Sequence, residues 1–338
     1  MIISIRKSAA IGALLATTCL SLTGQAFAAE KLSITLDTPP GHVRNVWIGK
    51  FADALEARSE GEIEVEVFDS GQLYSSRDAG KAVARGDAGM AIVSTASLSR
   101  IESNLNVLDL PMFAGMSPEE KNEVVDGPLG QDLANRTAEK MGVVVPGGWY
   151  ILGALDTYST DKVIASFADL EGMQVRIPGA PSWIAMYKTL GATPVSMPFT
   201  DVPLALQQGT VDAIVSSDLS VISAKLHESG LKHGFVNKLG VGYYMPIVSS
   251  DFWESLTAEQ QAMFKETWNE YVNGQRAAAA QEQSEARATL EAAGMDFHKP
   301  SDEEFEEVRK TFMELQPDLV SDLDISDEVL ALAEQAIN

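Results

Sequence analysis

The chain has 338 residues, of which 45% are hydrophobic and 22% charged, and its formal net charge is −23. This composition is typical of a globular protein and excludes a disordered or fibrous chain. The negative charge argues against nucleic-acid binding and against docking on anionic lipid, because both require basic surfaces. At about 150 residues per domain, the length favours two domains.

The first residues are typical of a secretory signal peptide. Two basic residues precede an apolar run over 9–22, and Ala26-Phe27-Ala28 matches a cleavage site. The run is too short for a membrane anchor, the alternative interpretation, because spanning needs about 20 apolar residues. We therefore expect residues 1–28 to be removed, which leaves an exported chain of net charge −25 without its one cysteine, Cys19.

The mature chain alternates between strand and helix patterns. Apolar runs predict strands at 31–36, 63–67, 90–94, 174–177 and 211–216. Helical spacing and capping residues predict helices at 47–61, 183–190 and 200–209. This alternation predicts an α/β fold with mostly parallel sheets flanked by helices, in two halves with a ligand cleft between them.

A long helical pattern runs from Thr257 to about Ala293. Its capping box is Thr257-x-x-Gln260, and Gly294 follows its end. At 1.5 Å per residue, this helix is long enough to lie across both domains.

The sequence contains no catalytic or metal-binding signature. A nucleophile elbow, a phosphate-binding loop and a dinucleotide-binding loop are all absent, and the four histidines are scattered. We therefore expect no enzymatic activity, no cofactor and no metal. An exported hydrolase or lyase remains an alternative, because catalytic residues need not be close in sequence.

Arg176 is the charged residue that best fits a ligand site. It ends an apolar strand just before Pro178. Ligands of open α/β sheets bind beyond the carboxyl ends of strands, and a guanidinium binds a planar oxyanion through two parallel hydrogen bonds. The alternative is a structural ion pair with an Asp or Glu.

Aromatic and polar side chains at turns and strand ends complete the predicted site. Their alternative roles are core packing for the aromatic residues and backbone capping for the polar ones. Besides Arg176, the predicted ligand-binding residues are Gln72, Tyr74, Ser94, Thr95, Trp149, Trp183, Phe199 and Ser216.

Several segments form a specific pattern: Val175-Arg176-Ile177-Pro178, then 190–194 (Leu-Gly-Ala-Thr-Pro), 197–199 (Met-Pro-Phe) and 205–212 (Ala-Leu-Gln-Gln-Gly-Thr-Val-Asp). The pattern resembles the DctP-like substrate-binding proteins of tripartite ATP-independent periplasmic (TRAP) transporters. The resemblance covers essentially the whole mature chain. Agreement extends to Gly71-Gln72-Leu73, Val93-Ser94-Thr95 and Asp109-Leu110-Pro111.

The resemblance implies a two-lobed periplasmic binding protein fold with hinge strands and a long helix spanning both lobes. Lobe I would comprise 29–153 plus about 237–272, and lobe II about 154–236 plus 273–338. It also implies a monomer in the periplasm that is not an enzyme. Such a protein captures a small organic anion, pairs its carboxylate with Arg176, and delivers it to a membrane permease.

Two positions differ from the family pattern. Leu155 stands where many members have a second arginine, and Ser216 stands where many have a ligand-binding asparagine. The ligand could therefore be a monocarboxylate, a differently bound dicarboxylate or a sulfonate. An ABC-type solute-binding protein is the rival interpretation, and the long helix and the 205–212 segment favour the TRAP family.

Overall fold

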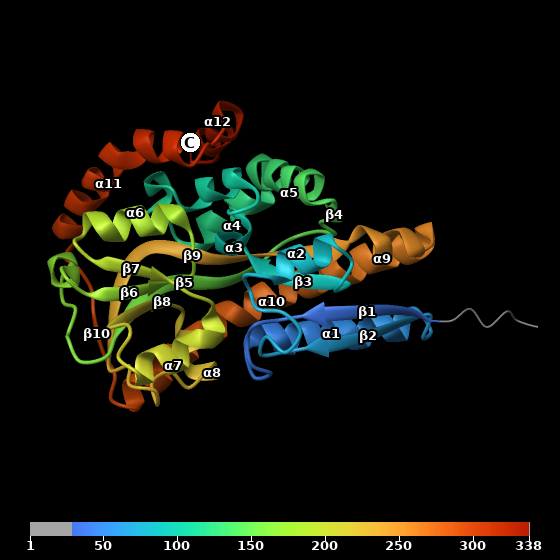
Figure 1. The fold of residues 1–338 in the computed structure, drawn as a ribbon, viewed down its shortest axis with the longest axis horizontal. Coiled ribbons are helices and arrows are strands. Elements are labelled where there is room, and N and C mark those ends of the chain that lie inside the picture. The colour runs from blue at the N-terminus through green and yellow to red at the C-terminus, as the bar shows by residue number, and fades with distance from the viewer. Residues whose placement is uncertain (1–28, 338) are drawn as a thin grey trace, which may run out of the picture.

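A computed structural model describes residues 29–337, so the signal peptide predicted at 1–28 lies outside the described residues. The described strands form one mixed sheet in the order β2-β1-β3-β9-β5-β8-β6-β7, and both β4 and β10 pair with β9. Helices cover both faces of this sheet (Figure 1). Over 29–337, no helix is both long and apolar enough to cross a membrane.

The elements follow in a regular order along the chain. The strands are β1 (Glu30–Thr35), β2 (Ile63–Phe68), β3 (Met90–Ser94), β4 (Val143–Val144), β5 (Tyr150–Ser159), β6 (Gln174–Ile177), β7 (Thr193–Ser196), β8 (Ala213–Ser216), β9 (His233–Ser249) and β10 (Asp296–His298). The α-helices are α1 (Val43–Arg58), α2 (Ala79–Ala84), α3 (Thr95–Leu98), α4 (Pro118–Asp126), α5 (Pro128–Met141), α6 (Pro181–Thr189), α7 (Val202–Gln207), α8 (Asp218–Ser223), α9 (Ser250–Ser255), α10 (Ala258–Ala292), α11 (Asp302–Asp322) and α12 (Asp327–Ala336). The short 3₁₀ helices are η1 (Ser103–Asp109), η2 (Pro111–Phe113), η3 (Phe167–Leu170) and η4 (Phe199–Asp201).

The two ends of the sheet are parallel and its centre is antiparallel. Strand β1 pairs in parallel with β2 and β3, and β6 pairs in parallel with β7 and β8. Strands β5 and β9 lie between these groups and pair antiparallel with each other, with β3 and with β8. The α/β fold with a mixed sheet is therefore confirmed, whereas the expectation of mostly parallel pairing holds only at the two ends.

The register brings the carboxyl ends of strands from both groups to the middle of the sheet. Strand β3 ends at Ser94 opposite Tyr244, and β8 ends at Ser216 opposite Asp156. Both partners lie well inside the long strands β9 and β5. Polar groups at these strand ends therefore meet over the central strands.

The predicted long helix is confirmed as α10, which has 35 residues and the capping box between Thr257 and Gln260. At 1.5 Å per residue, it is about 52 Å long. It packs on α1, β5 and α8, and so passes both ends of the sheet (Figure 1). Trp268 stacks on Tyr150 with ring centroids 5.0 Å apart, and Gln275 hydrogen-bonds both backbone groups of Ile151. These contacts hold the start of β5 on the helix.

Candidate functional site

A pocket lies where the strand ends meet. It is bounded by residues that follow β1, β3, β6 and β8, and by the middle of β5 and β9. Its volume is about 60 Å³. The pocket contains six of the nine predicted ligand-binding residues, namely Ser94, Thr95, Arg176, Trp183, Phe199 and Ser216.

Arg176 is buried, with 4% of its surface exposed. Its Nε and Nη2 donate to the carbonyl of Met197 at 3.2 and 3.0 Å, and its Nη1 donates to the carbonyl of Val215 at 3.2 Å. No described Asp or Glu forms an ion pair with it. Because a guanidinium has five N–H groups, one on each terminal nitrogen keeps no protein partner among the described residues.

Burial lowers the pKa of Arg176 to about 10, although Tyr244, Asp37 and Asp201 act in the opposite direction. The guanidinium therefore remains charged at neutral pH. A buried charge without a counterion is costly, and an anion in the pocket would remove that cost. The ring of Phe199 lies 5.9 Å from the guanidinium carbon and covers one side of it.

Arg44 provides a contrast in the same region. It is fully buried but forms an ion pair with Asp37, donates to Thr38 Oγ1 at 2.9 Å, and lies 4.2 Å above the ring of Tyr244. Its charge is thus balanced by the protein itself. Among the pocket's charged lining residues, Asp37, Asp109 and Arg176, only Arg176 is a cation.

Asp109 lies on another side of the pocket, at the end of η1. Its Oδ1 accepts a hydrogen bond from Nε1 of Trp183 at 2.8 Å. Burial raises the pKa of Asp109 to about 6, although this bond and the nearby Lys121 ammonium both lower it. Trp183 is the one described donor to this carboxylate, which keeps further capacity to accept a hydrogen bond.

Several hydroxyl groups complete the polar lining. Thr95 and Ser216 are buried, and no described protein group hydrogen-bonds their hydroxyls. Ser217 and Ser220 bond each other at 2.9 Å, and Ser220 also contacts Nε2 of His42 at 3.2 Å. The free hydroxyls can serve a ligand as donors or acceptors.

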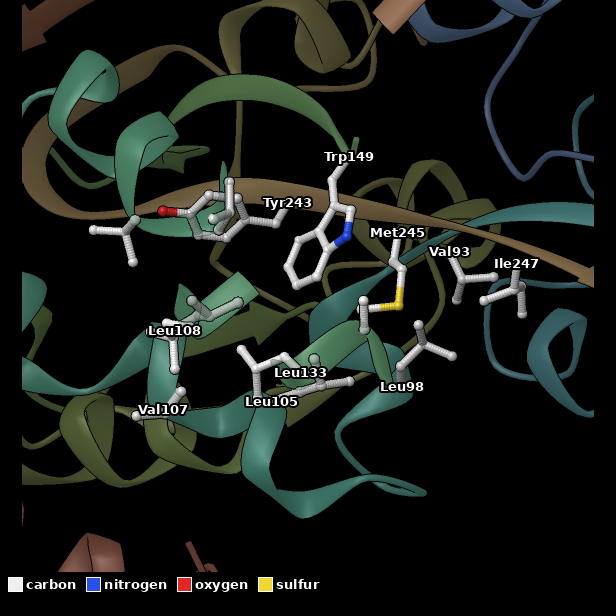
Figure 2. Packing of buried hydrophobic residues seen from close by; sticks show 14 of the residues in the cluster. Val93, Leu98, Leu105, Val107, Leu108, Leu133, Trp149, Tyr243, Met245 and Ile247 are labelled. Carbon is white, nitrogen blue, oxygen red and sulfur yellow. The ribbon is translucent and has the colours of Figure 1, made fainter. Parts of the chain in front are cut away.

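The structure places the remaining three predicted residues away from this pocket. Gln72 is exposed, and Tyr74 lines a small neighbouring cavity. Trp149 is 3% exposed and packs in the hydrophobic core with residues such as Leu133, Tyr243 and Met245 (Figure 2). The contacts of Trp149 therefore fit core packing, the alternative role considered for this residue.

Sequence reasoning missed several lining residues, including Asp37, Asp109, Leu152, Tyr243 and Tyr244. The last three lie on β5 and β9, which were not predicted as strands of full length. Asp109 carried a usable signal, because it is a lone acid in an apolar run just before Pro111. Within 29–337, no group of three or more potential ligands could hold a metal ion.

Comparison with known proteins agrees with this architecture. The family model DctP, described as bacterial extracellular solute-binding protein, family 7, matches residues 38–321. The C4-dicarboxylate-binding periplasmic protein DctP of Rhodobacter capsulatus is 29% identical over 87% of this chain and 88% of its own length. The 2,3-diketo-L-gulonate-binding periplasmic protein YiaO of Escherichia coli is 26% identical over 89% of this chain and 88% of its own length.

Solved structures share the fold. A TRAP periplasmic solute-binding protein from Sulfurospirillum deleyianum with bound succinate has a TM-score of 0.84 and 25% identity, and covers 92% of this chain and 100% of that one. A sugar acid binding protein from Advenella mimigardefordensis in complex with galactonate has a TM-score of 0.85 at 20% identity, and covers 91% and 99%. The predicted two-lobed fold is thereby confirmed. The chain belongs to the DctP family, family 7 of the bacterial extracellular solute-binding proteins, and is a solute-binding protein of the TRAP type.

Proposed function

We propose that this protein captures a small organic anion in the pocket around Arg176 and delivers it to the membrane permease of a TRAP transporter. The single observation that carries the proposal is the buried Arg176 guanidinium, which lacks an ion-pair partner among the described residues. Hydrogen bonds to the carbonyls of Met197 and Val215 fix the orientation of the guanidinium. Its remaining N–H groups can bind a carboxylate or a sulfonate. Relatives whose names specify C4-dicarboxylates and 2,3-diketo-L-gulonate support an organic acid as cargo.

The names of the relatives support a location for this function. DctP-type relatives are named as periplasmic proteins, and we propose that this chain acts in the periplasm as a monomer after removal of residues 1–28. Its role is transport and not catalysis. The one described histidine that contacts a pocket hydroxyl is His42, whose Nε2 lies 3.2 Å from Ser220 Oγ. Its Nδ1 accepts from the Arg44 N–H, so in the neutral ring Nε2 carries the proton and cannot take one from Ser220, as a catalytic base must.

Ligand binding would close two lobes over the anion. The proposed lobes are 29–153 plus about 237–272, and about 154–236 plus 273–338, with β5 and β9 as hinge strands. Three side-chain contacts join them at or beside the pocket, namely His42–Ser220 at 3.2 Å, Asp109–Trp183 at 2.8 Å and Arg100–Ser196 at 2.8 Å. A ligand that touches both lobes favours the closed state by its extra affinity for it.

Calorimetry and thermal unfolding with small carboxylates and sulfonates test the proposal. The protein is first unfolded and refolded to release any ligand bound during expression. A ligand at 100 times its Kd adds about 2.7 kcal/mol of stability to the wild type. We expect Arg176→Ala to abolish this gain and Arg176→Lys to restore little of it, because lysine lacks the paired N–H groups.

The exposed Arg85, which pairs with Asp87, provides a matched control. Arg85→Ala removes the same side chain away from the pocket and should bind like the wild type. Binding of acids that is unchanged in Arg176→Ala would show that the anion site lies elsewhere.

A further inference from the structure

The charged residues around the pocket indicate how many carboxylates the ligand can carry. Arg176 is one of three charged lining residues, and the other two are the carboxylates of Asp37 and Asp109. Asp37 is held by Arg44, and Asp109 accepts from Trp183. The lining residues therefore offer a single cationic group. Asp37 is neutralised by its ion pair with Arg44, whereas Asp109 has no ion-pair partner among the described residues and repels anions.

A second carboxylate on the ligand would find no counterion among the residues that line this pocket, because Arg77 and Arg100 line a separate neighbouring cavity. The walls between the charged groups include the aliphatic side chains of Leu152, Leu155, Val215 and Val241. A carboxylate placed against them loses its water without gaining a compensating hydrogen bond, which is strongly unfavourable. One placed at Asp109 would meet a like charge.

The same groups suit a hydroxyl. The Asp109 carboxylate can accept a hydrogen bond from a ligand hydroxyl, and the buried hydroxyls of Thr95 and Ser216 have no described protein partner. The aliphatic walls suit a hydrocarbon part of the ligand. These features divide the pocket into an anion site, a hydroxyl site and an apolar surface.

The size of the pocket restricts the ligand further. Its volume is about 60 Å³. On this scale a cavity needs at least roughly 10–15 Å³ to hold one water molecule, so the pocket is small and suits a compact ligand. A hexuronate or aldonate carries several hydroxyls, and the aliphatic walls offer them no hydrogen-bond partner.

We propose that the ligand is a short monocarboxylate that carries a hydroxyl group and an aliphatic part. Its carboxylate binds Arg176, and its hydroxyl donates to Asp109. The inference rests on the proposed function, since it takes Arg176 as the carboxylate site. It separates this protein from relatives and neighbours that bind C4-dicarboxylates or galactonate.

Calorimetry with matched acids tests this class. The probes are 2- and 3-hydroxyisovalerate, isovalerate without the hydroxyl, malate with a hydroxyl and a second carboxylate, succinate, and galactonate. We expect one hydroxyisovalerate to bind the refolded wild type at least tenfold more tightly than each of the other four acids.

Asp109→Asn tests the role of the carboxylate. Asparagine keeps an oxygen for the Trp183 hydrogen bond but removes the charge. We expect the affinity ratio of malate to hydroxyisovalerate to rise at least tenfold in this variant. Thermal unfolding verifies that the variant is folded. If it is not, the affinities of the wild type for the six acids still test the proposed ligand class.

The outcomes separate the two proposals. If malate or succinate binds the wild type as tightly as hydroxyisovalerate, and Arg176→Ala abolishes that binding, the monocarboxylate class is wrong and the anion site stands. Isovalerate binding as tightly as hydroxyisovalerate would overturn the hydroxyl assignment. If no acid binds, or binding survives Arg176→Ala, the proposed function itself fails.

Discussion

The indole Nε1 of Trp183 donates to Oδ1 of Asp109 across 2.8 Å, which connects α6 with η1 on opposite sides of the pocket. The ring is fixed in this orientation. It stacks on Tyr187 with an interplanar angle of 14°, and a Cβ at Gly240 would lie only 2.1 Å from it. Position 240 therefore has no room for a side chain, because the indole occupies that space.

Trp183→Phe should weaken ligand binding more than it weakens the fold. Phenylalanine keeps most of the stacking surface but cannot donate to Asp109. Hydrogen bonds to charged groups contribute about 1.5–3 kcal/mol, so we expect Kd to rise about tenfold or more if the bond forms only in the closed state. Calorimetry with the tightest acid of the panel measures the change.

Trp149→Phe is the matched control in the core. Trp149 packs among apolar residues (Figure 2) and does not line the pocket. The smaller ring leaves a cavity, so the free energy of unfolding should fall by about 1–3 kcal/mol with Kd unchanged. The opposite pattern, a stable variant with weakened binding, would place Trp149 at the ligand after all.

His42 should make stability depend on pH. It is fully buried, caps α1 by accepting from the Arg44 N–H at 3.1 Å, and contacts Ser220. Burial and the adjacent Arg44 lower the pKa of His42 well below 6.5. Below about pH 6.5, His42 is therefore protonated in the unfolded chain but stays neutral in the folded protein. The free energy of unfolding accordingly falls as the pH drops below about 6.5.

Between pH 7.5 and pH 5, we expect His42 to lower the free energy of unfolding by about 2 kcal/mol. His42→Asn keeps a side chain that can cap the helix but cannot titrate. It should be less stable than the wild type at pH 7.5, with a smaller difference at pH 5. Urea unfolding at the two pH values measures this, and equal pH slopes for both proteins would contradict it.

The sequence predicted the elements whose signals are local. Alternation at 63–67, the capping box at Thr257 and the apolar strand at 174–177, which contains Arg176, each occur in the structure as expected. Thr95 and Ser216 were found because polar residues at carboxyl ends of strands meet at a site. Such patterns depend on neighbours in the chain and can be read without the fold.

The central strands could not be predicted in the same way. Strand β9 has 17 residues and is interrupted by glycines such as Gly240 and Gly242, which weaken a strand pattern. Its pairing with β3, β5 and β10 comes from distant parts of the chain. The partners of Asp37 and Asp109 likewise depend on this assembly, so their part in the pocket became apparent only in three dimensions.

Two exposed arginines outside the pocket, in a neighbouring cavity, should speed ligand entry. Arg77 and Arg100 are exposed and line a small cavity that shares Ser76, Ser97 and Pro178 with the main pocket. Local positive charge matters in a protein with a net charge of −23, because screening over about 8 Å weakens the overall field.

Arg77→Ala combined with Arg100→Ala should lower the association rate severalfold at 20 mM salt, with little effect at 500 mM. Stopped-flow tryptophan fluorescence measures the rate. Lys310→Ala removes an exposed cation from α11 and should change neither rate. A salt-independent decrease in the double variant would indicate a role in closure, since Arg100 also bonds Ser196.

Leu155→Arg should convert the pocket toward dicarboxylates. Leu155 lines the pocket on β5, at the position where the family resemblance implies a second arginine. The new guanidinium would supply the counterion that a second carboxylate lacks, so we expect malate and succinate to bind at least tenfold more tightly than to the wild type. Leu155→Met, which keeps the apolar wall, should leave the affinities for all acids nearly unchanged.

The unliganded Leu155→Arg variant should also be less stable than the wild type, because a second cation joins the buried Arg176 without a counterion. Adding succinate should then raise its melting temperature more than that of the wild type, since the ligand neutralises both charges. Thermal unfolding with and without succinate tests this coupling. A variant that is destabilised and gains no affinity for succinate would show that position 155 does not face the part of the ligand distal to Arg176.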